Sequence, residues 1–341
     1  MKLSKLINAE IDSLLEQTSR SFYITLRVLP EGIRAQIGLL YLLARAADTI
    51  ADSEEGSIDE RLRALDEYDR RVKGDSETLP NLSNLAGLQS NPAEAKLLNQ
   101  ISLPISALDQ FAEADKVRLR ECLGIIIGGQ TLDLQRFGGA AEGKPVPLAD
   151  ENELDDYTYR VAGSVGEFWT HMSLEHLFET DAETREKLFE TGVRFGKALQ
   201  LINILRDIPE DLALGRCYIP EPVLAEHGLK PGDLLDSRNM EKFRPLFGSY
   251  IDKAESHLDA AVEYIGLLPH RQFRLRGACM LPVLIGQRTL ILLRSANVLD
   301  GENRVKVLRP EIKQLKNQTI RAILFRGKSQ RLLNKNRSQL A

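Results

Sequence analysis

Apolar residues recur along most of the chain at the three- and four-residue spacing that an amphipathic helix requires. The longest such segments predict helices over about 3–19, 31–52, 116–137, 184–211, 249–268 and 275–296. No segment alternates between apolar and polar residues as a half-buried strand does, and no motif repeats at a fixed period. The pattern predicts an all-α fold, with about a dozen helices around one core.

Three interruptions divide this helical pattern. Residues 78–92 and 138–147 are rich in turn-forming residues, which predicts surface loops. Pro104 is expected to break the helical segment between residues 93 and 111, because proline inside a helix removes a backbone hydrogen bond. The helical pattern resumes after the first loop without a shift in composition, so no domain boundary is expected there. We divide the chain into one domain over 1–310 and a tail over 311–341.

One polar face lies at the end of the fourth helical segment. Asn203, Asp207 and Asp211 follow at steps of four, so three oxygen-bearing side chains share a helical face beside Arg206. Oxygen ligands suit a hard divalent cation, and Mg²⁺ commonly uses one or two carboxylates together with substrate phosphates. A solvated acidic face that ends a helix at Pro209 would show the same pattern, so both interpretations stay open on this stretch alone.

A second polar stripe ends the very apolar segment over 31–52. Tyr41, Arg45, Asp48 and Asp52 lie at i, i+4, i+7 and i+11, which places them on one helical face. A buried carboxylate is costly unless it is paired or bound to a metal, so this stripe favours a functional role over a solvated surface. Facing each other across a helical bundle, the two acidic helices could hold Mg²⁺ between them.

Such a pair of acidic helices suits the ionisation of an amphiphile with a diphosphate head and a hydrocarbon tail. Metal ions at the mouth would neutralise the departing diphosphate. A dry lining of Leu, Ile, Phe, Gly and Ala would protect an allylic cation from water, and Tyr rings could stabilise it through their faces. The expected site is a central apolar cavity with a metal–carboxylate mouth.

Two further motifs fit this chemistry without requiring it. In Ser19-Arg20-Ser21, two hydroxyls flank a guanidinium that could bind a phosphate, although either Ser could equally cap a helix. Small residues in a helical segment make room for a helix crossing or a ligand, and they are Ala162, Gly163, Ser164 and Gly166.

Composition and charge narrow the function classes. The chain has 341 residues, 43% of them apolar and 28% charged, which is enough for a large core with a pocket. The net charge of -4 gives nucleic-acid binding no support. Cys122, Cys217 and Cys279 are widely spaced, so neither a zinc site nor a disulfide framework is expected, and they suit a reducing compartment. There is no Gly-x-Gly-x-x-Gly or Walker motif.

We expect a cytoplasmic monomer that contacts a membrane at most peripherally. No apolar run approaches the roughly twenty residues that span a bilayer. Asn8, Glu10 and Asp12 interrupt any signal-peptide core. From Lys313 onward the sequence has eight basic residues and no acidic one, with apolar residues interleaved. Such a basic amphipathic tail can rest on an anionic membrane, or it can be a frayed, solvated terminus.

Four motifs, in this order, resemble the squalene/phytoene synthase family of head-to-head prenyl synthases. They are Ser19-Arg20-Ser21-Phe22, Tyr41-x-x-x-Arg45-x-x-Asp48-Thr49-Ile50-Ala51-Asp52, Tyr157-x-Tyr159-x-Val161-Ala162-Gly163-x-Val165-Gly166, and Gln200-x-x-Asn203-Ile204-Leu205-Arg206-Asp207-x-x-Glu210-Asp211. One motif alone would be weak evidence, whereas four in order are specific. The resemblance covers roughly residues 15–300 and implies the isoprenoid-synthase fold, an all-α helical bundle in a single domain.

The resemblance also implies roles for individual residues. Mg²⁺ would be held by Asp48, Asp52, Asn203, Asp207 and Asp211. Substrate and diphosphate would contact Ser19, Arg20, Ser21, Phe22, Arg45, Gln200 and Tyr218. The expected catalytic residues are Tyr41, Tyr159 and Arg206, of which Tyr159 would assist ionisation or proton handling. Glu210 lies off the Asp207–Asp211 face and is expected to be a bystander.

Among family members, a bacterial type of squalene synthase is favoured. Such an enzyme joins two farnesyl diphosphates through presqualene diphosphate and reduces the product with NADPH. The segment 298–307 is similar to a basic segment associated with NADPH in squalene synthases, so Arg304 and Lys306 are the expected cofactor-binding residues. Arg160 departs from the pattern, because eukaryotic squalene synthases have Tyr there.

Several alternatives stay open. Phytoene or dehydrosqualene synthesis, or presqualene diphosphate synthesis alone, would need no reduction. A one-substrate terpene cyclase would share the acidic helices without the Val-Ala-Gly motif, and a non-catalytic scaffold would release no diphosphate.

Overall fold

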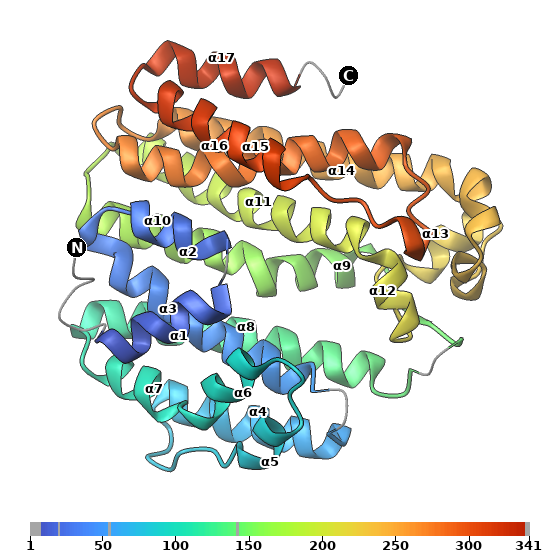
Figure 1. Cartoon of the computed structure of the whole chain (residues 1–341), viewed down its shortest axis with the longest axis horizontal. Coiled ribbons are helices and arrows are strands. Elements are labelled where there is room, and N and C mark those ends of the chain that lie inside the picture. The colour runs from blue at the N-terminus through green and yellow to red at the C-terminus, as the bar shows by residue number, and fades with distance from the viewer. Residues whose placement is uncertain (1–7, 20, 54–55, 141–142, 338–341) are drawn as a thin grey trace. The chain divides into compact units, whose positions relative to one another are not determined.

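The computed structural model describes residues 8–19, 21–53, 56–140 and 143–337, and their regular secondary structure is almost entirely helical (Figure 1). Contacts divide the chain into two compact units. Unit 1 comprises residues 1–135 and 167–180, and unit 2 comprises residues 136–166 and 181–341. The predicted all-α fold is confirmed within each unit.

Unit 1 is built around α3, Glu31–Ala51, most of whose residues are buried. Its run of Leu, Ile and Ala favours a helix and leaves few polar positions before its C-terminal end. The helices packed on α3 are α1 (Ala9–Ser19), α2 (Ser21–Val28), α4 (Ile58–Lys73), α6 (Pro92–Asn99) and α7 (Ser102–Asp109). The unit also contains α5 (Ser83–Gly87) and most of α8 (Glu113–Phe137) and α10 (Ser164–His176).

Unit 2 is built around three long helices, α11 (Ala182–Arg206), α14 (Met240–Leu267) and α15 (Phe273–Ser295). Shorter helices complete it: α9 (Glu151–Thr158), α12 (Ile208–Ala213), α13 (Glu221–Glu226), α16 (Arg309–Ile323) and α17 (Arg326–Arg337). One π-helix, η1 (Tyr159–Gly163), follows α9, and three 3₁₀ turns are η2 (Pro231–Leu235), η3 (Ser237–Asn239) and η4 (Gly301–Asn303).

A short parallel strand pair was not expected from the sequence. β1, Val146–Pro147, pairs with β2, Arg216–Cys217, with Val146 opposite Arg216. Two-residue strands are too short for an alternating pattern to form, so the sequence carries no signal for them. The pair fastens the loop after α8 to the loop after α12 inside unit 2.

Two predicted helix boundaries in unit 1 are wrong. The expected loop over 78–92 contains α5. Pro104 does not break the helical segment, because it lies in the first turn of α7, where a proline costs no hydrogen bond. The break occurs instead at Gln100, which caps the C-terminal end of α6.

Two boundaries in unit 2 also differ from the prediction. α14 begins at Met240 rather than near residue 249, and it includes Pro245. The expected helix over 184–211 is interrupted at Asp207, which has φ -100° and ψ 14°. The interruption follows from Pro209, which cannot donate a backbone hydrogen bond and restricts the residue before it. The chain continues as α12, with this proline in its first turn.

The cluster of small residues makes a close helix crossing. η1 and the start of α10 pack on α11, and a Cβ atom added to Gly166 would lie 2.0 Å from the Gly192 carbonyl oxygen. A Cβ atom on Gly196 would lie 2.1 Å from the Ala162 carbonyl oxygen. The backbones therefore touch at these two glycines, which decides for the helix-crossing alternative at this point of the chain.

The predicted tail is helical and packed. α16 and α17 both contact α15, so the residues after 310 are not a frayed terminus over the described range. α16 begins at Arg309, close to the predicted boundary at residue 310. Among the described helices, α15 is long and apolar enough to cross a membrane, but 61% of that stretch is buried inside the protein, as in the core helix of a folded domain.

Candidate active site

In unit 1, aromatic and hydroxyl groups gather where α1, α2 and α3 meet. The rings of Phe22 and Tyr41 lie with their centroids 4.9 Å apart. The Tyr41 hydroxyl donates to the Thr18 carbonyl oxygen at 3.2 Å. Ser19 is buried at the end of α1, and its hydroxyl donates to the Leu15 carbonyl oxygen, one turn back in the same helix. The face of an aromatic ring is the part suited to a cation, and two such rings lie together here.

The acidic stripe lies at the C-terminal end of α3. Asp48 accepts a hydrogen bond from the Gln130 amide of α8, and its carboxylate is 3.9 Å from the Arg45 guanidinium. Asp52 caps α3, and its backbone N–H donates to the Asp48 carbonyl oxygen at 2.8 Å. The predicted one-face arrangement of these two carboxylates is therefore kept to the last turn.

The Asp48 carboxyl carries an unfavourable negative charge. Burial raises its pKa to about 7, and the charges of Asp52 and Glu94 raise it further, while Arg45 acts in the opposite direction. The side chain still exposes 36% of its surface, so the carboxylate can be reached from solvent. A carboxylate that is crowded, accessible and close to other acids is a good ligand for a cation.

Two predicted substrate-binding residues carry no side-chain evidence. Arg20 lies outside the described residues, and Ser21 is described only as the first residue of α2. Their proposed contacts with a diphosphate stay predictions.

In unit 2, Asp207 lies between two arginines. Arg206 donates to both carboxylate oxygens of Asp207, at 2.7 and 2.5 Å. Arg304 donates to the Asp207 Oδ1 atom at 2.6 Å from a segment 97 residues further along the chain. Although burial opposes it, these hydrogen bonds and charges lower the pKa of Asp207, so this carboxyl is ionised at neutral pH.

Glu210, expected to be a bystander to the metal ligands, forms an ion pair within the same group, and its part in metal binding stays a prediction. Its Oε1 atom is 2.9 Å from the Arg304 Nε atom. α11 ends at Arg206 and α12 begins at Ile208, so Glu210 lies in the first turn of a second helix. Arg304 thus joins Asp207 to Glu210, and the expected cofactor-binding residue is engaged with an expected metal ligand.

The i, i+4 spacing of the other ligands survives the interruption. The Asp207 backbone N–H donates to the Asn203 carbonyl oxygen at 2.9 Å, and the Asp211 N–H donates to the Asp207 carbonyl oxygen at 2.9 Å. Asn203 is exposed, and Asp211 and Gln200 are half-buried, so their side chains are not enclosed in the core. Lys306 is also exposed.

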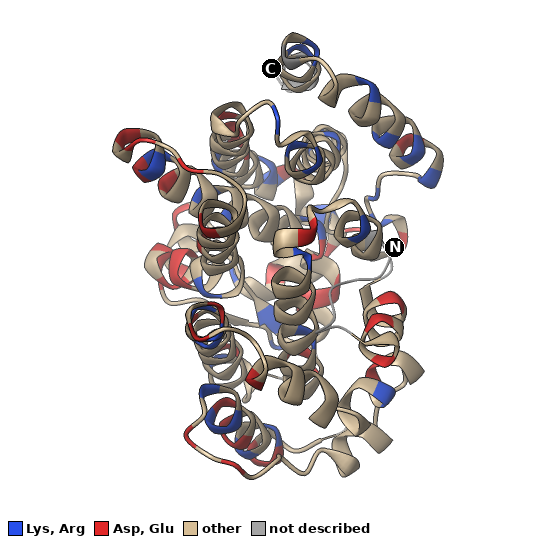
Figure 2. Cartoon of the chain, turned by 90° about the vertical axis from the view of Figure 1, so that its left-hand side faces the viewer, with Lys and Arg blue, Asp and Glu red and all other residues tan. Residues whose placement is uncertain are grey.

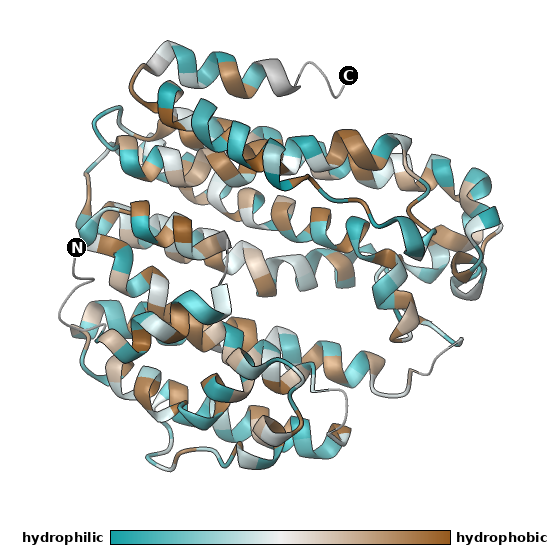
Figure 3. Ribbon diagram, viewed as in Figure 1, coloured by the Kyte–Doolittle hydropathy of each residue, from teal (hydrophilic) through white to brown (hydrophobic). Residues whose placement is uncertain are grey.

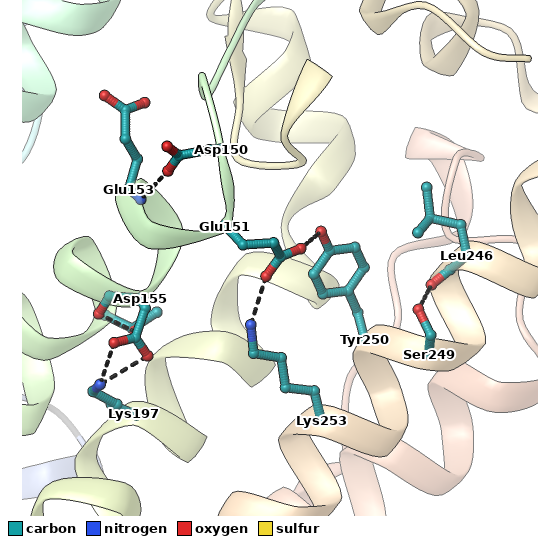
Figure 4. Close-up of polar contacts among 10 residues, drawn as sticks. Asp150, Glu151, Glu153, Asp155, Lys197, Leu246, Ser249, Tyr250 and Lys253 are labelled. Carbon is teal, nitrogen blue, oxygen red and sulfur yellow. Dashed lines mark hydrogen bonds and ion pairs between the residues drawn. The ribbon is translucent and has the colours of Figure 1, made fainter. Parts of the chain in front are cut away.

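Tyr159 begins the π-helix η1 and lies beside α11. The Lys197 ammonium is 5.8 Å from the centre of its ring, within reach of a cation–π contact. Lys197 is held by both carboxylate oxygens of Asp155 at 2.8 Å (Figure 4). A π-helix turn is an inserted residue that is frequently found at functional sites, and here it re-aims the residues that follow Thr158.

A second polar network lies next to this pair. Glu151 accepts hydrogen bonds from the Tyr250 hydroxyl and, at 2.6 Å, from the Lys253 ammonium (Figure 4). These bonds tie α9 to α14, and the Asp155–Lys197 pair ties α9 to α11. The segment that precedes Tyr159 is therefore fixed from two sides.

Tyr218, an expected substrate contact, is a buried aromatic residue. Its ring stacks on Tyr157 with centroids 4.8 Å apart and meets Phe137 edge to face at 5.2 Å. Its hydroxyl donates to the Tyr157 hydroxyl at 3.3 Å. In unit 2 this residue supports the strand pair and α9 through its packing.

The four motifs lie within a region that matches a known protein family. The sequence profile of the family described as "Squalene/phytoene synthase" matches residues 15–311. The chain belongs to the squalene/phytoene synthase family. The resemblance inferred from four motifs is thereby confirmed over most of the chain.

Individual relatives within the squalene/phytoene synthase family have different named activities. The chain is 32% identical over 211 residues to a presqualene diphosphate synthase of Zymomonas mobilis, which covers 62% of the chain and 60% of that protein. It is 29% identical over 262 residues to a bifunctional lycopene cyclase/phytoene synthase of Aspergillus oryzae, covering 75% of the chain and 42% of that protein. The chain spans about half the length of the curated relatives that it matches.

The fold is shared with solved squalene/phytoene synthase family structures. The structure of TcSQS with the ligand BPH1237 matches with a TM-score of 0.78 at 19% identity, covering 97% of this chain and 90% of that one. This likeness confirms the predicted isoprenoid-synthase fold.

The donor sets in both units suit Mg²⁺. Unit 1 offers the carboxylates of Asp48 and Asp52, and unit 2 offers Asp207, Asp211 and the Asn203 amide. All are oxygen ligands, which a hard cation prefers, and the raised pKa of Asp48 indicates a carboxylate that a cation would stabilise. The residues present in this chain therefore fit the metal that the resemblance implies.

A separate cluster in unit 1 is explained without a ligand. Asp115, Glu175 and His176 bring their polar atoms within 4.8 Å of one another. Asp115 is already bonded to the His176 Nε2 atom at 2.7 Å and to the Gln36 amide at 2.9 Å. These bonds link α3, α8 and α10, so the cluster has a structural role in this family member.

Proposed function

We propose that this family member catalyses a Mg²⁺-dependent head-to-head condensation of two prenyl diphosphates, with farnesyl diphosphate as the favoured substrate. The observation that carries the proposal is the complete set of oxygen ligands within the family match, at Asp48, Asp52, Asn203, Asp207 and Asp211. A helical scaffold without catalysis would not need this set of five oxygen-bearing side chains at the C-terminal end of α3 and across the junction of α11 and α12.

Different residues of the chain would have different roles in such a reaction. Mg²⁺, when bound by the acidic residues, supplies the positive charge that stabilises a departing diphosphate. Arg206 and Arg45 carry fixed positive charges next to Asp207 and Asp48, where diphosphate oxygens can replace part of their present bonds. The faces of the Phe22 and Tyr41 rings can stabilise an allylic cation.

Tyr159 would handle the proton or assist ionisation. Its ring lies beside the Lys197 ammonium, which both carboxylate oxygens of Asp155 hold in place. The tight glycine crossing of η1 on α11 fixes the position of this residue, and a fixed group loses little freedom on reaching the transition state. The central apolar cavity and the roles of Gln200 and Ser19 stay predictions.

The second candidate function adds a reduction by NADPH and yields squalene. The observation that favours it is the basic segment with Arg304 and Lys306, since Arg304 reaches Asp207. A dinucleotide phosphate could take the place of this carboxylate as the partner of Arg304. Presqualene diphosphate as the end product, named for one relative, and phytoene, named for another, are the alternatives.

Variants of one acidic residue from each motif test the condensation. Asp48→Asn and Asp207→Asn keep the size of the side chain and remove its charge, so diphosphate release from farnesyl diphosphate should fall by about 100-fold or more, because metal stabilisation contributes several kcal/mol. Asp236→Asn is the matched control, since Asp236 pairs only locally with Arg238 in the described structure and should leave the rate unchanged. Wild-type rates in both test variants, with intact helicity, would refute the proposal.

A further inference from the structure

The last two helices carry an unusual concentration of exposed apolar side chains. Among the large apolar residues that the structure describes, the four most exposed are Leu324 at 60%, Leu308 at 56%, Phe325 at 54% and Ile320 at 51%. All four lie within eighteen residues of one another, at the two ends of α16. A single exposed Leu needs no explanation, whereas a cluster of this kind marks an interaction surface.

The exposed residues are not left over from poor packing of α16. The inner side of this helix is buried, with Thr319 and Ala322 4% and 5% exposed, and Ile323 lies against Gly277 of α15. Ile320 and Leu324 are four apart and therefore share the outer face of the helix. The helix is thus apolar on two sides. One side packs against the rest of unit 2, and the other faces solvent.

Basic side chains surround this outer face. Lys313, Lys316 and Arg321 are exposed on α16, and Lys328 lies 4.3 Å from the centre of the Phe325 ring. No acidic residue follows Glu311, and Glu311 itself is neutralised by Arg288 at 2.8 Å. Figure 2 shows Lys and Arg along the C-terminal helices, and Figure 3 shows the apolar turn between α16 and α17.

The geometry points to a docking surface for an anionic lipid bilayer, made of Leu308, Ile320, Leu324 and Phe325 with Lys313, Lys316, Arg321 and Lys328. Apolar side chains enter the boundary between headgroups and acyl chains, and the basic residues pair with anionic headgroups. Stable attachment of a peripheral protein takes two such signals together, and this surface supplies both. The surface would hold the protein at a membrane, which is where a prenyl product of the proposed function would partition.

Full-length protein and vesicles without substrate or divalent metal test this inference, so its outcome is independent of the condensation activity. Wild-type protein should float with vesicles of phosphatidylcholine and 30% phosphatidylglycerol. It should not float with phosphatidylcholine alone. Lys313→Gln with Lys316→Gln and Arg321→Gln should weaken binding by about 100-fold, at roughly fivefold for each basic residue near the surface.

An apolar variant and a matched control separate the two signals. Ile320→Gln with Leu324→Gln and Phe325→Gln should also abolish flotation, at unchanged helicity. Leu214→Gln with Leu235→Gln removes two apolar residues that are 45% and 44% exposed elsewhere in unit 2, and it should bind as wild type does. The inference would be overturned if wild-type protein bound neutral and anionic vesicles equally, or if either test variant bound as wild type does. It would also be overturned if wild-type protein formed a dimer without binding vesicles and the apolar variant lost that dimer.

Discussion

Replacing Gly196 by Ala tests the close helix crossing that positions Tyr159. The added Cβ atom would lie 2.1 Å from the Ala162 carbonyl oxygen, and real Cβ atoms essentially never come closer than 3.0 Å to a neighbour. η1 and α11 must therefore separate by about 0.9 Å at this point, and the nearest atoms are backbone, which cannot rotate away. Overpacking of this kind costs about 1–3 kcal/mol.

The cost converts into a measurable change of melting temperature. At about 2.1 cal/mol/K for each of 341 residues, the unfolding entropy is about 0.7 kcal/mol/K, so the clash should make Gly196→Ala melt about 1.5–4 °C below a helical Gly→Ala change that meets no neighbour. Thermal unfolding followed by circular dichroism measures this shift. Turnover of the folded Gly196→Ala protein should also fall, because a small displacement of a catalytic group has a large effect on rate.

Gly248→Ala is the matched control, because it makes the same chemical change in the interior of another long helix. Nothing lies within 4 Å of a Cβ atom at Gly248 in α14. Alanine is the better helix former by about 1 kcal/mol, so this variant should melt about 1 °C higher than wild type. If Gly196→Ala matched Gly248→Ala in stability and in activity, the close approach of η1 and α11 would not require glycine at position 196.

Two other predictions concern the acidic motifs. The folded-state pKa of Asp48, about 7, exceeds its unfolded value, so the folded protein binds the extra proton, and metal-free stability should fall as pH rises from about 4 to about 7. Asp48→Asn should flatten this part of a pH series of unfolding midpoints, and an unchanged slope would contradict the assignment. Arg304→Gln removes a cation that competes for Asp207, so Mn²⁺, used as a probe for Mg²⁺, should bind about two- to fivefold tighter by calorimetry, as expected from an ion pair of about 0.5–1 kcal/mol. Arg238→Gln should leave Mn²⁺ affinity unchanged, and equal or weaker binding by Arg304→Gln would argue against the competition.

The sequence alone was sufficient to predict the fold class and the protein family. The helical spacing of apolar residues is a local property, and it predicted the long helices to within a few residues, except at the start of α14 and the end of α11. Pro104 and Pro209 show why boundaries are less certain. A proline ends a helix in one context and begins one in another, and only the position of the turn decides between them.

Contacts between distant segments could not be predicted in this way. Gln130 is 82 residues from Asp48, and Arg304 is 97 residues from Asp207, so no local pattern relates either pair. The ion pair of Glu210 with Arg304 was missed for the same reason, since the two residues are far apart in the sequence. Gln130 did carry a signal, because it follows two glycines in a helix and shares a face with Asp133.

Incubation of the purified protein with farnesyl diphosphate and Mg²⁺, with and without NADPH, tests the central claim most directly. Extraction and mass spectrometry of the products separate the outcomes. The account predicts a cyclopropyl C30 diphosphate that forms only with Mg²⁺, and conversion of that intermediate to squalene only when NADPH is present. Release of a C15 alcohol or cyclised terpene with no C30 product, or no turnover at all, would contradict the head-to-head condensation.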